Sequence, residues 1–263
     1  MLGTKIAFWL AVFFLTYIYF GYPLLLSAMA LRKKITKAQE SYEPSVSLII
    51  AAYNEEAVIG DKIENSLQLD YPRDKLEIIV FSDASTDRTD EIVKSYANQG
   101  VKLLRIEGRK GKTYCQNEAA KIAQGEILVF SDANSMYEPD AIRKLVRHFA
   151  DGRVGCVSGE LRYRSSKGSV EGERTYWKYE QIIKRLESRV SSMIGVNGSI
   201  YAVRKDLFEP LPSDVLEDFL RPLRLVRKGY RVIYEPNAAN WETTAPNPSR
   251  EFRRRVRIVT QSV

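Results

Sequence analysis

The stretch VSLIIAAYNEE, at residues 46–56, decides the fold class of this chain. Its first seven residues form a short apolar run rich in β-branched side chains, and polar residues follow at once. Similar runs occur at 76–82 (LEIIVFS), 101–107 (VKLLRIE) and 126–132 (EILVFSD), and the segments between them carry helical periodicity. Strand, helix and strand at this spacing predict an α/β fold with a doubly wound, mostly parallel sheet flanked by helices.

Polar residues follow the predicted strands directly. They are Tyr53-Asn54-Glu55-Glu56, residues 82–87, residues 108–112 and residues 131–134. Taken singly, such residues are commonly helix caps or turn formers. Because ligands of these sheets lie beyond the carboxyl ends of the strands, four polar edges in consecutive units indicate one shared polar crevice. The sequence contains neither G-x-G-x-x-G nor G-x-x-x-x-G-K-[ST], so a dinucleotide fold and a P-loop are not supported.

A long apolar run near the N-terminus predicts one transmembrane helix. Ile6 to Leu31 contains no Asp, Glu, Lys or Arg. A helix of that length rises about 39 Å, more than the roughly 30 Å hydrocarbon core of a bilayer. A cleaved signal peptide is the alternative, but its apolar region is usually about 7–15 residues long. We therefore predict a transmembrane anchor with a basic flank at 1–37 and a folded domain at 38–263.

The distribution of charge predicts the orientation of this anchor. The chain has 40 Lys and Arg against 33 Asp and Glu, a net charge of +7. Two segments account for the excess, residues 32–37 directly after the apolar run and residues 250–257 near the end. By the positive-inside rule, the domain lies in the cytoplasm of a single-pass protein of the inner or plasma membrane. The remainder is nearly neutral, so we expect no nucleic-acid partner.

Cysteine and histidine counts exclude several site classes. The two cysteines, Cys115 and Cys156, offer neither a disulfide framework nor a metal-binding spacing. The single histidine, His148, lies in a helix-like stretch, where a packed or surface histidine is the usual case. A histidine-based triad and a zinc site are therefore not expected.

Six motifs occur in a series that is similar to a known family. They are VSLIIAAYNEE, FSDASTDRT, GKTYCQNEA, VFSDANS, VNGSIYAVRKDLF and LEDFLRPLRLVRKGYRVIYEP. From Pro44 to Gln261 the chain resembles family-two glycosyltransferases of the GT-A fold, in the membrane-anchored branch that includes cellulose, chitin, hyaluronan and poly-N-acetylglucosamine synthases. The resemblance implies an inverting hexosyl- or N-acetylhexosaminyltransferase of polysaccharide or glycolipid synthesis. It would move a sugar from a nucleotide-diphosphate sugar, expected to be a UDP-sugar, to a hydroxyl of a glycan or lipid-linked acceptor.

The resemblance assigns donor-binding roles to residues at the strand ends. Tyr53 and Glu55 match positions that line the nucleoside pocket, Asp83 resembles the residue that hydrogen-bonds uracil, and Lys112 resembles the cation beside the pyrophosphate. Asp132 and Asn134 occupy the Asp-x-Asp element that holds the nucleotide sugar through a divalent ion. Their oxygen ligands suit Mg²⁺ or Mn²⁺, although Asn134 supplies one charge fewer than aspartate.

The catalytic and acceptor elements follow later in the chain. Glu217-Asp218 matches the family's Glu-Asp element, and Asp218 resembles the base that takes the proton of the acceptor hydroxyl. The alternative for Asp218 is a carboxylate favoured by the N-terminal dipole of a helix. By resemblance, Asn197 and Gly198 lie near the acceptor, and Glu217 is assigned with them to the acceptor and interface side.

The final motif departs most from the family. Where the synthases have Gln-x-x-Arg-Trp at the membrane interface, this chain has Arg254 in place of Gln, a matching Arg257 and Ile258 in place of Trp. Processive polymerisation is therefore less supported than a single transfer. A helix predicted at 174–190, with Trp177 and Tyr179, suits either a membrane interface or ordinary packing.

Two further interpretations follow from these departures. With Asn134 and the altered last motif, a non-catalytic nucleotide-sugar-binding subunit, partnered with membrane subunits of a synthase, is the alternative function. The sequence stops at Val263, where relatives continue into further transmembrane helices, so it is compatible with a truncated chain.

Overall fold

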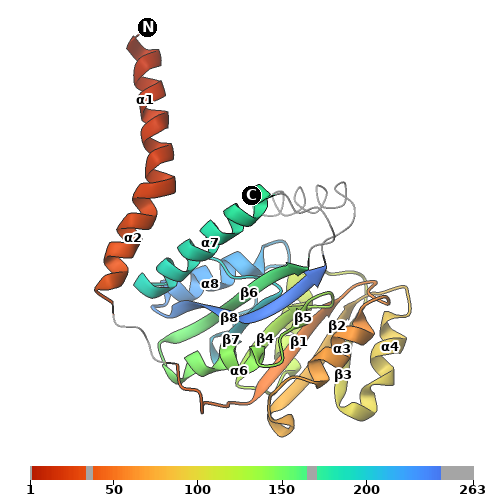
Figure 1. Ribbon diagram of the computed structural model, residues 1–263. Helices are drawn as coiled ribbons and strands as arrows, with labels where there is room; N and C mark the ends of the chain where they lie inside the picture. Colours follow the sequence, from red (N-terminus) through yellow and green to blue (C-terminus); the bar gives the residue numbers. More distant parts are fainter. Residues whose placement is uncertain (1, 34–37, 165–170, 244–263) are drawn as a thin grey trace.

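The centre of the protein is an eight-stranded sheet in the order β3-β2-β1-β4-β7-β6-β8-β5 (Figure 1). The computed structural model describes residues 2–33, 38–164 and 171–243. The strands are β1 (Val46–Ala52), β2 (Leu76–Asp83), β3 (Val101–Ile106), β4 (Ile127–Asp132), β5 (Met136–Tyr137), β6 (Val154–Arg164), β7 (Ile200–Arg204) and β8 (Arg231–Thr243).

The first half of the sheet is parallel, as the four apolar runs predicted. β1 pairs with β2 and β4, and β2 pairs with β3, all in parallel. In this register Ala52 lies opposite Ser82, and Ala51 lies opposite Asp132. The polar residues that follow β1, β2 and β4 therefore start from one edge of the sheet.

The second half of the sheet is mixed, which the apolar runs did not predict. β7 pairs antiparallel with β4 and with β6, β6 pairs parallel with β8, and β5 pairs antiparallel with β8. Because β7 runs antiparallel to β4, its first residue, Ile200, lies opposite Ser131 at the end of β4. The loop that precedes β7 is thereby brought to the same edge as Asp132.

Helices cover both faces of the sheet, which confirms the doubly wound architecture. One face packs against α3 (Ile59–Leu67), α4 (Thr89–Ser95) and α6 (Ala141–Val146), and the other against α5 (Lys112–Ile122) and α8 (Glu217–Arg227). Successive residues of β1 alternate between the two cores, with Leu48 and Ile50 in one and Ile49 in the other. Short 3₁₀ turns lie at Arg73–Lys75, Ala97–Gln99, Arg147–Ala150 and Lys205–Leu207.

The N-terminal apolar run forms a helix that projects from the body of the protein (Figure 1). It comprises α1 (Leu2–Thr16), a π-helical segment (Tyr17–Gly21) and α2 (Tyr22–Leu31). Among the described residues, Leu2–Leu31 is the one helix long and apolar enough to cross a membrane, and most of it is exposed.

The C-terminal part of this helix, α2, packs against α7 (Glu171–Val190). α7 contains the helix predicted at 174–190. Leu26 and Ala30 pack against Val190, and the Tyr22 hydroxyl donates to Glu187 Oε1 at 2.6 Å. The apolar helix is therefore fixed to the folded domain by side-chain packing as well as by the chain itself.

Candidate active site

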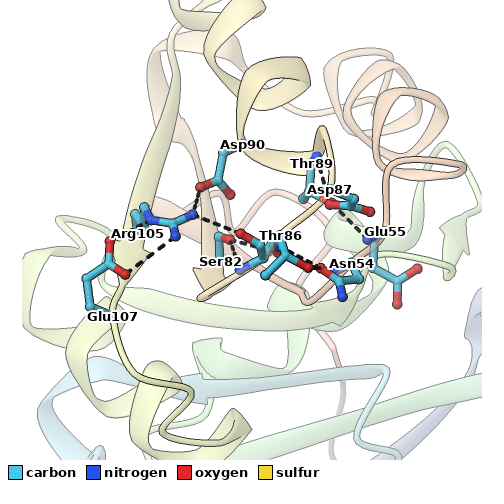
Figure 2. A network of polar contacts seen from close by, with 10 residues as sticks. Asn54, Glu55, Ser82, Thr86, Asp87, Thr89, Asp90, Arg105 and Glu107 are labelled. Carbon is cyan, nitrogen blue, oxygen red and sulfur yellow. Dashed lines mark hydrogen bonds and ion pairs between the residues drawn. The ribbon is translucent and has the colours of Figure 1, made fainter.

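The loop after β1 is locked to the loop after β2 by a network of hydrogen bonds (Figure 2). The backbone N–H groups of Asn54, Glu55 and Glu56 donate to Ser85 Oγ, Thr89 Oγ1 and Asp87 Oδ2, at 3.1, 2.8 and 3.0 Å. Asn54, which adopts a positive φ of 54°, returns a bond by accepting from the Thr86 N–H at 2.8 Å. This interlock fixes the first two polar edges relative to each other.

Asp87 stabilises the two loops from behind by accepting hydrogen bonds from the Glu56 and Thr89 N–H groups. Burial acts to raise the pKa of its carboxyl, but bonds from Thr89 and from the Glu56 N–H outweigh burial and lower the pKa below its usual range. Arg105, on β3, extends the same support by donating to Asp90, to Glu107 and to the Ser85 carbonyl (Figure 2).

Asp83 holds the loop that leads into α5. Its carboxylate is 6% exposed and accepts the N–H of Lys110 at 2.7 Å and of Gly111 at 2.9 Å. Position 111 favours glycine, because the backbone there has a φ of +89°, which side chains with a Cβ rarely adopt. Each carboxylate oxygen can accept more than one hydrogen bond, so Asp83 keeps the capacity to accept from a uracil ring. Its contact with uracil stays a prediction.

Tyr53 pairs with a residue that the sequence prediction left out. The Arg109 guanidinium lies 3.8 Å from the centroid of the Tyr53 ring, and Arg109 Nη1 donates to the Tyr53 hydroxyl at 2.6 Å. Arg109 is exposed and has a φ of 43°. The signal for it was the run Gly108–Lys112 after a predicted strand, in which only Lys112 was assigned a role.

Lys112, the first residue of α5, joins three segments of the site. Its Nζ lies 2.7 Å from Asp132 Oδ1 and 3.4 Å from Glu217 Oε1, and it donates to the Gly198 carbonyl at 3.3 Å. Burial lowers the pKa of Lys112, but the carboxylates of Asp132 and Glu217 outweigh burial and hold the pKa well above its ordinary value. The lysine is therefore a stable cation at the point where these three segments meet.

Asp218 lies in the first turn of α8, next to the buried Glu217. Burial, followed by the charge of Glu217, raises the pKa of the Asp218 carboxyl to about 6, while Lys112 acts in the opposite direction. Such a carboxyl is a better proton acceptor than an ordinary aspartate, as a general base must be. This environment suits a general base, and the assignment of Asp218 as the base stays a prediction.

The loop before β7 wraps around Asp218. The Val196 N–H donates to the Asp218 carbonyl at 2.9 Å, and a Cβ on Gly198 would lie 3.2 Å from Asp218 Oδ2. The Asn197 N–H donates to Ser158 Oγ at 2.9 Å, and its side-chain Oδ1 accepts from Ser199. Asn197 and Gly198 thus belong to a loop that contacts Asp218, and their acceptor role stays a prediction.

Glu217 is buried at the start of α8, and its assignment to the acceptor and interface side stays a prediction. Its side chain is buried and accepts from Thr113 Oγ1 at 3.3 Å and from Gln116 Nε2 at 3.4 Å, in addition to its contact with Lys112. In the structure Glu217 orients Lys112 and α5. Arg254 and Arg257, the other predicted interface residues, lie outside the described residues.

Comparison with known families agrees with this arrangement. The sequence model of Glycosyl transferase family 2 matches residues 47–209, more than half of the chain. The chain belongs to glycosyl transferase family 2. The match covers β1 through β7 and includes Tyr53, Asp83, Lys112 and Asp132, while Asp218 lies beyond it.

The curated relatives that match by sequence include polysaccharide synthases. The poly-beta-1,6-N-acetyl-D-glucosamine synthases of Staphylococcus epidermidis and Staphylococcus aureus are each 28% identical, over 235 and 221 residues. These alignments cover 86% and 81% of this chain but 56% and 53% of the relatives. The chain thus spans about half the length of the curated relatives it matches.

Solved structures show the same fold. The mannosyltransferase PcManGT from Pyrobaculum calidifontis, in complex with GDP-Man and Mn²⁺, superposes with a TM-score of 0.80 at 30% identity, covering 94% of this chain and 72% of that one. TarS of S. aureus, residues 1–349 in complex with UDP-GlcNAc, has a TM-score of 0.57 at 20% identity, which supports the fold alone. The superposition covers 77% of this chain and 59% of that one. These likenesses confirm the predicted GT-A fold.

The family-2 site was predicted to hold Mg²⁺ or Mn²⁺, and its donor set fits such an ion bound together with phosphate. Among the described residues no three acidic, histidine or cysteine side chains form a metal cluster. Asp132 is one-third exposed and Asn134 is exposed, which suits the one or two protein ligands that Mg²⁺ commonly takes beside substrate phosphates. Burial, followed by the charges of Asp132 and Asp87, raises the pKa of Glu55, so a cation here would relieve an excess of negative charge.

Proposed function

We propose that this family-2 protein is a membrane-anchored, inverting glycosyltransferase. It transfers a hexosyl or N-acetylhexosaminyl group from a nucleoside diphosphate sugar to a hydroxyl of a glycan or lipid-linked acceptor. The observation that carries the proposal is the convergence of Asp218, with its pKa raised to about 6, and Lys112, which contacts Asp132 at 2.7 Å. A base for the acceptor and a cation for the leaving group are thus brought together, since Lys112 contacts Glu217, the neighbour of Asp218.

Asp218 is the group that handles the acceptor proton. As the acceptor oxygen attacks the anomeric carbon, its proton passes to the Asp218 carboxylate. The bond from that carbon to the diphosphate oxygen breaks, and its electron pair leaves with the nucleoside diphosphate. Attack opposite the leaving group inverts the anomeric centre. Gly198 leaves room for the acceptor at Asp218 Oδ2, because any Cβ at this position would lie 3.2 Å from that oxygen.

Lys112 is the group that stabilises the leaving diphosphate. It lies at the N-terminus of α5, where the helix dipole also favours negative charge. A fixed cation that faces charge developing in the transition state is among the largest contributions to catalysis. A bound Mg²⁺ or Mn²⁺, held by Asp132 and Asn134, would supply further Lewis-acid stabilisation of the diphosphate.

The nucleoside end of the donor is assigned to Tyr53, Glu55 and Asp83. The Arg109 guanidinium above the Tyr53 ring adds a cation to this end of the crevice. The assignment of uridine rests on the likeness of Asp83 to a uracil-binding residue. The names of the relatives support both sugar classes, N-acetylglucosamine in the staphylococcal synthases and mannose in PcManGT.

The apolar helix at Leu2–Leu31 is assigned the role of the membrane anchor. Arg32 and Lys33 follow it directly, and Tyr22 fixes it to α7. By the positive-inside rule, these cations support a location of the folded domain on the cytoplasmic face of the inner or plasma membrane. A lipid-linked acceptor at that surface would reach the enzyme without leaving the membrane, and a glycan would reach it from the cytoplasm.

A donor screen tests the proposal. The full chain, purified in detergent or nanodiscs, is incubated with Mn²⁺ and UDP-GlcNAc, UDP-glucose or GDP-mannose, and nucleoside diphosphate release and products are measured by mass spectrometry. We expect release from one donor that is lost in Asp218→Asn. Nucleotide binding without release or transfer to any lipid or glycan acceptor would instead show a non-catalytic subunit of a synthase complex.

A further inference from the structure

Lys62, in α3, is a fully buried lysine beneath the turn that carries Asp132 and Asn134. Its side chain is 0% exposed. Its Nζ donates to the backbone carbonyl of Ser135 and lies 4.0 Å from the centroid of the Tyr137 ring. The lysine thus reaches from a helix on one face of the sheet to the residue directly after Asn134.

Further hydrogen bonds, besides the one from Lys62, hold the turn after β4 in place. Within the turn, the Ser135 N–H donates to the Asp132 carbonyl at 3.1 Å. The Ser135 hydroxyl donates to Glu242 Oε1, on β8, at 2.6 Å. Asn65, one turn along α3 from Lys62, accepts the Tyr137 N–H at 2.8 Å and donates to the Tyr137 carbonyl at 2.9 Å. α3 therefore grips the segment that follows the Asp-x-Asn element.

Burial of the Lys62 amine at this position costs desolvation free energy. Burial lowers the pKa of Lys62 to about 7, against the opposing charges of Asp132 and Glu242. An apolar side chain of similar length would avoid this desolvation cost, so packing alone does not account for a lysine here. Both the ammonium and the neutral amine can donate to the Ser135 carbonyl, so the grip on the turn does not depend on the protonation state.

We infer that Lys62 is a positioning residue that holds the Asp132-Ala133-Asn134 turn ready to receive the divalent cation of the donor complex. The inference rests on the proposed function. Lys62 acts through the Ser135 carbonyl and does not itself reach the nucleotide sugar. Groups that orient metal ligands from behind commonly contribute about 10- to 100-fold to metal affinity.

The test measures Mn²⁺ affinity in the full chain. Mn²⁺ is titrated in the presence of UDP and free Mn²⁺ is followed by electron paramagnetic resonance, with thermal unfolding recorded for every variant. We expect Lys62→Met to bind Mn²⁺ about tenfold more weakly than wild type. Glu235→Gln is the matched control, because Glu235 is also buried and ion-paired, but with Arg147 and His148. It should lower the unfolding temperature and leave Mn²⁺ affinity unchanged.

The outcomes separate this inference from the proposed function. Wild-type protein that binds no Mn²⁺ with UDP would overturn the metal-dependent function and this inference together. Wild-type binding with unchanged affinity in Lys62→Met would overturn the inference alone. If Lys62→Met fails to fold, the double variant Lys62→Met/Glu242→Gln removes both buried charges, retains an acceptor for the Ser135 hydroxyl, and is expected to show the same tenfold loss.

Discussion

Lys112 Nζ lies 2.7 Å from Asp132 Oδ1, and this contact joins the start of α5 to the end of β4. The same ammonium lies 3.4 Å from Glu217, which precedes Asp218 at the start of α8. One cation thus connects the element assigned to the donor with the element assigned to the acceptor. A negatively charged diphosphate entering the crevice would meet a cation already held in place, so little reorganisation is needed when the leaving group acquires charge.

We expect Lys112→Met to lower kcat by about 100- to 1,000-fold, because removal of one preorganised group that stabilises charge in the transition state costs about that much in other enzymes. Steady-state kinetics with the donor found in the screen measure the loss. Lys121→Met is the control on the same helix, since Lys121 is 61% exposed and pairs only locally with Glu118. Activity retained in Lys112→Met would remove Lys112 from the leaving-group role.

Asp218→Asn should abolish transfer and also stabilise the fold. A base must be deprotonated, so with a pKa raised to about 6 the wild-type kcat/KM should fall as the pH drops below about 6. A carboxyl whose pKa is raised on folding destabilises the native state above that pKa, since the folded environment disfavours its charge. At pH 8 the neutral amide should therefore add about 1 kcal/mol of stability.

The pH–rate profile and thermal unfolding at pH 8 check the two parts of this prediction. An acid limb near pH 4, typical of an unperturbed aspartate, would contradict the assignment of Asp218 as the base. A loss of stability in Asp218→Asn would show that the carboxylate supports α8 through the helix dipole instead.

Gly198→Ala should lower kcat while nucleotide affinity is retained. The new Cβ would lie 3.2 Å from Asp218 Oδ2, so the carboxylate or the loop must shift by a few tenths of an ångström. We expect about a tenfold loss in kcat, because small misplacement of a catalytic group has large effects on rate. Gly152→Ala is the control, since nothing lies within 4 Å of a Cβ there. An equal loss in both variants would show a general effect of added side chains.

The sequence predicted the parallel half of the sheet because its strands are buried on both faces. Leu48, Ile49 and Ile50 are all fully buried, and such strands produce continuous apolar runs that are recognisable without a structure. β7 and β8 carry the same signal less clearly, since polar residues such as Arg204 and Asn237 interrupt or flank them. Their antiparallel and parallel pairings are set by tertiary contacts that no local pattern encodes.

The candidate site was predictable to the extent that its residues follow strands or repeat a family motif. Asp132 and Asp218 could be found in this way. Lys62 could not, because it lies inside a helix, where a lysine is normally exposed. Arg109 follows a predicted strand, but its contact with Tyr53 joins residues far apart in sequence and could not be predicted. Only the structure shows that Glu217 is buried against α5.

Asn134→Asp, which restores the family's Asp-x-Asp element, should strengthen binding of the divalent ion. The change in Mn²⁺ affinity measures the effect of asparagine at this position. Asn134 is exposed, so an added carboxylate carries little desolvation cost and should leave the fold intact. Affinity for hard cations rises with the number of charged ligands, and we expect Mn²⁺ to bind about tenfold more tightly in the presence of UDP. Asn134→Ala removes the oxygen ligand and should shift the affinity the other way. If neither substitution changes Mn²⁺ affinity while Asp132→Asn does, Asp132 alone contacts the ion and Asn134 belongs only to the turn.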